Sequence, residues 1–189
     1  MVADRPGGPS DPEWVVRGER TLYDSRWVRL NLVDVQPPGG DRFEHHVLRM
    51  QRVAVSLVLD ESETHVLMMR RHRFIDGTWG WEVPVGIVEA DETAERAAYR
   101  EVEEETGWRP RDLKRLVTFQ PAIGIADSPH DVFLGVGADF VTSEIDPSEA
   151  AAVTWTPIEA LLGLVDQGAI RDGATLVAVL HLLAGRARS

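Results

Sequence analysis

Residues 93–106 give the strongest secondary-structure signal in the chain, a helix with a defined end. Ala94, Ala97 and Ala98 are strong helix formers, and no glycine or proline interrupts the stretch. Gly107 follows at the position where a left-handed residue commonly ends a helix. The pattern therefore predicts a helix of about four turns that stops at Gly107.

One side of this predicted helix is apolar and the other is charged. At about 100° per residue, Ala98, Tyr99 and Val102 share the side that a core can cover. The charged side spans an arc of roughly 140° and consists of Arg100, Glu101, Glu104 and Glu105. Most charge runs on helices are solvated faces, and this is the simplest interpretation of the charged side.

Two features of the charged side are unfavourable without a partner. Glu101 and Glu105 are four residues apart, and like charges at that spacing destabilise a helix by roughly 0.2–0.5 kcal/mol. Residues 103–105 are all glutamate and crowd the last turn, where the helix dipole favours a cation. Mg²⁺ takes oxygen ligands and would offset this repulsion. From these residues alone, a solvated face and a metal site both stay open.

The spacing of residues around the helix resembles the signature of the Nudix hydrolases. The resemblance rests on a glycine, a glutamate, an Arg-Glu-aliphatic-x-Glu-Glu-x-Gly run and a final apolar residue at the spacings of that family. Every fixed position is matched, by Gly86, Glu92, Arg100, Glu101, Val102, Glu104, Glu105, Gly107 and Trp108. The resemblance implies an α+β fold, an α/β/α sandwich in which helices flank a mixed β-sheet, with an N-terminal β extension.

The resemblance also assigns roles to residues of this stretch. It implies that Mg²⁺, with Mn²⁺ as an alternative, is held by the carboxylates of Glu101, Glu104 and Glu105. The backbone carbonyl of Val85 is expected to complete the ligand set. Arg100 is expected to pair with a neighbouring carboxylate and so fix its rotamer. These three glutamates and Arg100 form the predicted catalytic set, together with an acid from a later loop.

The residues that lead into this stretch are similar to the ADP-ribose and nucleotide-sugar pyrophosphatase branch of that family. Residues 81–86 read Trp-Glu-Val-Pro-Val-Gly, where the branch has Trp-Glu-Leu-Pro-Ala-Gly. Arg73 stands where the branch carries the arginine of a Gln-x-Arg segment. The resemblance favours Arg71 and Arg73 as phosphate or ribose contacts, which suit guanidinium groups, over surface charges that balance nearby acids.

Glu82 and Trp81 complete the predicted substrate-binding set, and each has a second interpretation. Glu82 either supports the site or is an ordinary strand residue. Trp81 either stacks on a nucleobase or packs in the core.

The loop over residues 120–131 is the expected source of a general base. In the resembling branch this loop carries Ser-Pro-Gly followed by a catalytic glutamate, whereas this chain offers Asp127 and Asp131 instead. Asp127 lies nearer to the position of that glutamate and is preferred. The alternative is that Asp127 only caps the turn at Ser128 and Pro129.

Composition narrows the class of protein. The chain has 189 residues and a formal net charge of −11, a length that suits one domain with a substantial core. The acidic balance argues against nucleic acid, since that binding depends on surplus Lys and Arg. The acidic charge does not exclude a small phosphorylated substrate, because bound metal cations can make the potential at the site positive. A small nucleotide is therefore the expected partner. Cysteine is absent, which excludes disulfides and thiolate chemistry. No apolar stretch reaches the ~18 residues of a membrane span, and a cytoplasmic protein is expected.

The rest of the chain is predicted to form one domain over residues 13–189, after a flexible tail at 1–12. Strands are predicted at 13–24, 27–36, 43–50, 53–59, 65–71, 113–119, 132–140 and 153–155, and further helices at 157–167 and 173–184. The last helix is expected to turn Leu176, Val177, Leu180 and Leu183 to the core. Residues 13–36 are rich in apolar side chains and are the expected contact of a homodimer.

The resemblance predicts metal-dependent hydrolysis of a nucleoside diphosphate linked to another group. ADP-ribose or a related nucleotide sugar is the expected substrate, and a nucleoside monophosphate and a sugar phosphate are the products. One alternative is a nucleoside-triphosphate pyrophosphatase that sanitises the nucleotide pool. Another is a module that senses a nucleotide sugar without cleaving it, although such modules usually lose the glutamates that this chain keeps.

Overall fold

The computed structural model describes residues 12–145 and 150–188. The described chain forms two compact units: residues up to 50 with 124–127, and residues 51–123 with 128–188. The predicted tail at 1–12 lies outside the described residues except for its last position. The assignment of 13–189 to a single domain stays a prediction.

The first unit is a four-stranded sheet in the order β1-β2-β3-β10. Its strands are β1 (Val15–Asp24), β2 (Val28–Gln36), β3 (Phe43–Met50) and β10 (Ala126–Asp127). The first three are antiparallel neighbours, and β10 pairs with β3 in parallel. The three long strands are those predicted, within two residues at each end. β10 was not predicted, because two residues carry too little pattern to mark a strand.

The second unit contains a mixed sheet in the order β13-β5-β4-β11-β9, with β6 paired to β5 and β7 to β4. Its strands are β4 (Val53–Leu59), β5 (His65–Arg73), β6 (Thr78–Glu82), β7 (Val85–Ile87), β9 (Leu113–Phe119), β11 (His130–Val136) and β13 (Ala152–Pro157). Only the β4–β11 pair is parallel. A separate ribbon joins β8 (Trp108–Pro110) to β12 (Ala138–Phe140).

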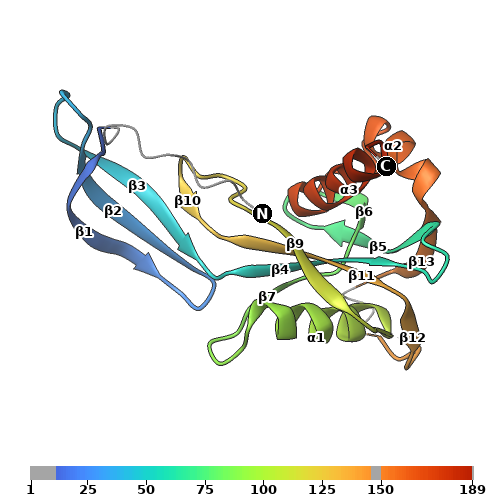
Figure 1. Cartoon of the computed structure of the whole chain (residues 1–189). Helices are drawn as coiled ribbons and strands as arrows, with labels where there is room; N and C mark the ends of the chain where they lie inside the picture. Colours follow the sequence, from blue (N-terminus) through green and yellow to red (C-terminus); the bar gives the residue numbers. More distant parts are fainter. Residues whose placement is uncertain (1–11, 146–149, 189) are drawn as a thin grey trace. The chain divides into compact units, whose positions relative to one another are not determined.

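Helices cover both faces of this mixed sheet, as the α/β/α prediction requires. α1 (Ala94–Thr106) lies on one face, and α2 (Ile158–Asp166) and α3 (Gly173–Arg186) lie on the other (Figure 1). Among the described residues, none of the helices is long and apolar enough to cross a membrane.

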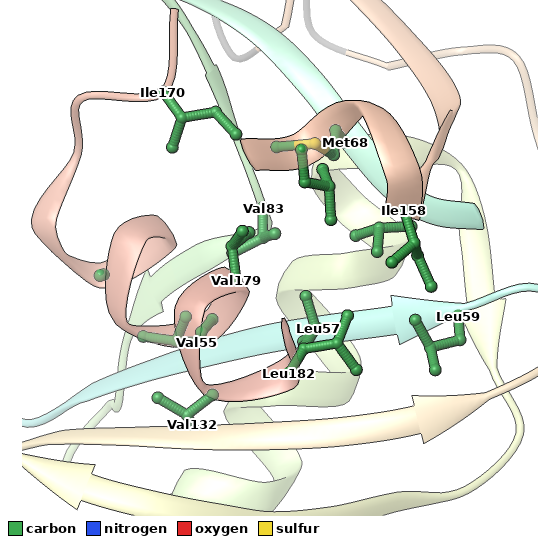
Figure 2. Close-up of a cluster of buried hydrophobic side chains, with 14 residues drawn as sticks. Val55, Leu57, Leu59, Met68, Val83, Val132, Ile158, Ile170, Val179 and Leu182 are labelled. Atoms are coloured by element: carbon green, nitrogen blue, oxygen red, sulfur yellow. The ribbon is translucent and has the colours of Figure 1, made fainter. Parts of the chain in front are cut away.

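Strand β4 is buried on both faces, as its continuous apolar run predicts. Val55, Leu57 and Leu59 belong to the core beneath α3, where Figure 2 shows them. Ala54 and Val58 alternate with them and pack against α1. One strand therefore fixes the position of helices on opposite sides of the sheet.

Helix α3 buries a stripe that differs from the predicted one. Its buried residues are Ala174, Thr175, Ala178, Val179 and Leu182. The prediction for Leu180 is wrong, because this residue is 44% exposed and lies off that stripe. Leu176, Val177 and Leu183 are partly buried and pack at the edge of the core.

Helix α1 begins and ends where the sequence predicts. The Thr93 hydroxyl accepts a hydrogen bond of 3.2 Å from the backbone N–H of Arg96, which caps the first turn. Gly107 ends the helix with φ +74°, a conformation that favours glycine. A Cβ atom at position 107 would also overlap the backbone of Thr142, so both strain and space require glycine.

Candidate active site

Gly86 in β7 lies against the side chain of Glu101 in α1. A Cβ atom at position 86 would overlap the Glu101 carboxyl group, so only glycine allows Glu101 this position. Strand β7 is held by β4, with Gly86 opposite Ala54. The glycine of the sequence signature therefore fixes the place of a carboxylate.

Glu105 lies one turn further along α1 and is buried. Its side chain is 5% exposed, and one carboxylate oxygen accepts a hydrogen bond of 3.0 Å from the backbone N–H of Val85. The guanidinium of Arg71, also buried, lies 2.7 Å from the other oxygen. The structure thus directs Arg71 at a helix carboxylate, and its contact with a substrate phosphate stays a prediction.

Burial raises the pKa of both acids. It raises the pKa of Glu105 to about 7, and the neighbouring Glu101 charge adds to this while Arg71 opposes it. Burial also raises the pKa of Glu101, although the hydrogen bond from Arg100 acts in the opposite direction. A negative charge on Glu101 therefore disfavours a negative charge on Glu105.

Arg100 ties the turn before α1 to the charged side of the helix. Its guanidinium donates to the two carboxylate oxygens of Glu92, at 2.9 and 3.0 Å, and to the backbone carbonyl of Ile87 at 3.1 Å. It also donates to Glu101 at 2.7 Å and to Glu104 at 3.1 Å. The predicted pairing with a neighbouring carboxylate is present, and Arg100 acts on the acids around it as a positioning group.

The donor chemistry of this helix face fits a hard divalent cation. Within 12–145 and 150–188, no three His, Asp, Glu or Cys side chains already stand together as a metal-binding group. Glu104, the predicted third ligand, is 59% exposed and contacts Arg100. Glu101 and Glu105, however, offer carboxylate oxygens one turn apart, and burial raises the pKa of each, so a cation between them would favour their ionised forms. These two acids, with Val85 beside Glu105, are the residues that would hold the cation.

Half-exposed Arg73 pairs with buried Glu82 on the wall of a hollow. Arg73 donates to the two oxygens of Glu82 at 2.9 and 2.5 Å, and the Glu82 side chain is 3% exposed. The hollow has a volume of about 450 Å³. Both residues were predicted to bind substrate, and the structure brings them together beside an open space. Asp76, Arg171 and Asp172 also line this hollow and were not predicted.

Trp81 packs against the core beneath α3 and donates its backbone N–H to the Ala169 carbonyl at 2.8 Å. Stacking of Trp81 on a nucleobase stays a prediction. Trp79 is half-exposed, and its ring contacts His72 at a centroid distance of 5.2 Å.

The two candidate bases have different surroundings. Asp127 belongs to the first unit, is 48% exposed and pairs with Arg49 at 3.0 Å. Asp131 in β11 is fully buried and contacts Arg52 and Thr118, each at 2.5 Å. Burial raises the pKa of Asp131, but these hydrogen bonds outweigh burial and hold the pKa below its ordinary value.

The comparisons with known proteins agree with this arrangement. A family model described as the NUDIX domain matches residues 50–177, about two thirds of the chain. The chain therefore belongs to the Nudix family.

Two curated relatives cover most of the chain. The CMP-5'-(N-acetyl-N-hydroxy-3-aminopropyl)phosphonate hydrolase of Streptomyces rubellomurinus is 42% identical over 170 residues, which are 90% of this chain and 82% of the relative. The ADP-ribose pyrophosphatase of Bacillus subtilis is 29% identical over 164 residues, with coverage of 85% and 88%. The crystal structure of an ADP compounds hydrolase has a TM-score of 0.79 and 18% identity over 96% of this chain and 100% of that one, and this likeness supports the fold. The chain is thus a Nudix hydrolase similar to ADP-ribose and ADP-sugar pyrophosphatases.

The raised pKa of Glu105 predicts a pH-dependent stability of the metal-free protein. Between its ordinary value of 4.5 and the folded value of about 7, the folded state binds more protons than the unfolded state. Stability therefore falls as the pH rises through this window. We expect chemical unfolding in EDTA from pH 5 to 8 to show this fall in the free energy of unfolding for wild type. The fall should be absent from Glu105→Gln. Glu104→Gln, an exposed neighbour, serves as the control. Parallel stability curves for wild type and Glu105→Gln would contradict the assignment.

Proposed function

We propose that this protein hydrolyses the phosphoric anhydride of a nucleoside diphosphate linked to a second group, with Mg²⁺ or Mn²⁺ as the cofactor. Water is added across the P–O–P bond, and a nucleoside monophosphate and the phosphorylated second group are released. The observation that carries this proposal is the pair of carboxylates on α1, partly buried Glu101 against Gly86 and buried Glu105 one turn further along.

The residues of the charged face of α1 and the arginines of β5 would have different roles in this reaction. A bound divalent cation would neutralise the diphosphate and acidify a water molecule. Glu101 and Glu105 would hold it, while Arg100 and Arg71 keep these two carboxylates in position through their ion pairs. Arg73, fixed by Glu82, presents a cation at the wall of the hollow, where an oxygen of the substrate can meet it.

The relatives support the substrate class. By their names, one acts on ADP-ribose and another on a phosphonate linked to CMP. We propose ADP-ribose or a related nucleotide sugar as the substrate. The 42% identity to the CMP-phosphonate hydrolase favours a CMP-linked phosphonate as a second candidate. Two alternatives remain from the sequence: a nucleoside triphosphate as the substrate, and a module that senses a nucleotide sugar without cleaving it.

A substrate panel with Mg²⁺ tests the proposal. The panel contains ADP-ribose, other nucleotide sugars, a CMP-linked alkylphosphonate and ATP, and chromatography measures the nucleoside monophosphate released. The highest kcat/KM for ADP-ribose or a nucleotide sugar supports the first candidate, and the highest value for the CMP conjugate supports the second. Turnover of triphosphates alone would contradict both. Binding of nucleotide sugars without any turnover would indicate a sensor.

Removing a metal-holding carboxylate should separate activity from folding. We expect Glu105→Gln to lower kcat by about a hundredfold or more, because loss of an outer partner of a metal ligand already costs roughly 10–100-fold. Stabilisation by Mg²⁺ in thermal unfolding should also shrink. Glu103→Gln is the matched control, since Glu103 lies on the same helix and pairs with Arg109 at 2.7 Å. Normal turnover and Mg²⁺ stabilisation in Glu105→Gln would place the metal elsewhere.

We propose Asp127 ahead of Asp131 as the general base. About half of the Asp127 side chain is accessible to water. Asp131 is fully buried and paired with Arg52, and its pKa lies below the ordinary value of an aspartate. A carboxylate with a lowered pKa is a weak proton acceptor. Asp127→Asn should lower kcat and remove the acidic limb of the kcat–pH profile while KM and stability change little. An unchanged profile would assign the proton transfer to another group.

We also propose a homodimer formed through the first unit. All ten residues of β1 are exposed, and Val16, Tyr23 and Trp27 are each more than half exposed, a concentration of apolar surface that needs cover. Light scattering at micromolar concentration should give twice the mass of 21.0 kDa. Val16→Arg should shift the mass to the monomer, whereas Leu162→Arg, at an exposed leucine of α2, should not. A monomeric wild type would refute the dimer.

A further inference from the structure

The hollow beside Arg73 and Glu82 is lined by three acids and two arginines, and each arginine is paired with one of the acids. Arg73 pairs with Glu82 at 2.5 Å, and Arg171 pairs with Asp76 at 3.5 Å. Asp172 is the remaining acid on the wall. Both arginines of this wall, Arg73 and Arg171, are therefore already paired with a carboxylate.

The acids of the wall are held in fixed positions. Asp76 accepts hydrogen bonds from the backbone N–H and the hydroxyl of Thr78, at 3.2 and 2.7 Å. Asp172 caps α3 and accepts from the backbone N–H of Thr175 at 2.8 Å. The bond from the Trp81 N–H to the Ala169 carbonyl draws the segment before α3 alongside β6. The acidic side chains of the wall are therefore held in place by the protein itself, without a ligand.

The hollow lies next to the proposed metal face. Arg71 and Arg73 alternate along β5 and so point to the same side of the strand. Arg71 contacts Glu105, and Arg73, two residues further along the strand, lines the hollow. A diphosphate held at Glu105 would place its attached group near this wall.

We propose that this hollow binds the neutral, hydroxyl-bearing group attached to the diphosphate of the substrate, such as a pentose, and that Arg171 and Asp76 determine this specificity. The inference rests on the proposed function and deepens it. A hydroxyl group both donates and accepts, so it bonds to the carboxylates and the guanidinium groups without separating either pair.

A terminal phosphate is disfavoured in the same hollow. It would face Asp76, Glu82 and Asp172, and it would have to take a guanidinium from one of them. Separating Arg73 from Glu82 would leave a carboxylate that is 3% exposed without its partner, which is strongly unfavourable. The hollow therefore selects nucleotide sugars over nucleoside triphosphates.

Kinetics with a truncated substrate test this subsite. Wild type, Arg171→Ala and Asp76→Asn are assayed with ADP-ribose, with the β-methyl ester of ADP, which lacks the sugar, and with ATP. Each variant should lose about tenfold in kcat/KM for ADP-ribose and much less for the methyl ester, as expected for loss of one charged hydrogen-bond partner. Asp76→Asn should also narrow the preference for ADP-ribose over ATP. Arg186→Ala, an exposed arginine near Glu63, is the control. Equal losses on all three substrates, or no loss on ADP-ribose, would overturn the subsite.

A binding measurement separates this inference from the proposed function. Calorimetry with Mg²⁺ compares ribose 5-phosphate with methyl phosphate, and neither probe requires turnover. Wild type should bind ribose 5-phosphate about tenfold more tightly, and Arg171→Ala should lose this preference. Equal affinity of wild type for both probes would overturn the subsite even if ADP-ribose is hydrolysed. Failure to hydrolyse any diphosphate compound would overturn the proposed function, while the binding result still decides the subsite.

Discussion

The two-sided burial of β4 is the constraint on which the second unit depends. Its alternating side chains take α1 on one face of the sheet and α3 on the other, so that neither helix can shift without opening a core. The same strand pairs with β7 and thereby places Gly86 under Glu101. A hydrophobic strand with no chemistry of its own thus positions the acids of the site.

The sequence predicted the parts of the fold that are determined locally. The ends of α1 follow from Thr93 and Gly107, and the charged face follows from helical periodicity. The course of β4 follows from its apolar run. These features need only neighbours along the chain, which is why pattern and composition were sufficient for them.

Features that depend on contacts between distant segments were not predictable in this way. Strands β6 and β7 are short and are defined by their partners β5 and β4. The exposure of Leu180 depends on which stripe of an almost wholly apolar helix meets the sheet. The sequence indicated that Arg71 and Arg73 belong to the site, but not that each would be fixed by a buried glutamate. Arg171, almost a hundred residues later in the chain, carried no signal for the hollow that it lines.

The alternation of β5 makes the site sensitive to length as well as to residue type. Arg71 and Arg73 reach their glutamates because β13 and β6 hold the register of β5 from its two edges. A slip of β5 by one residue against these two partners would exchange the two faces of the strand. Arg70 and His72 would then turn to the helix, and both buried acids would lose their counter-ions. The strands that pair with β5 are therefore as necessary to the site as the two arginines themselves.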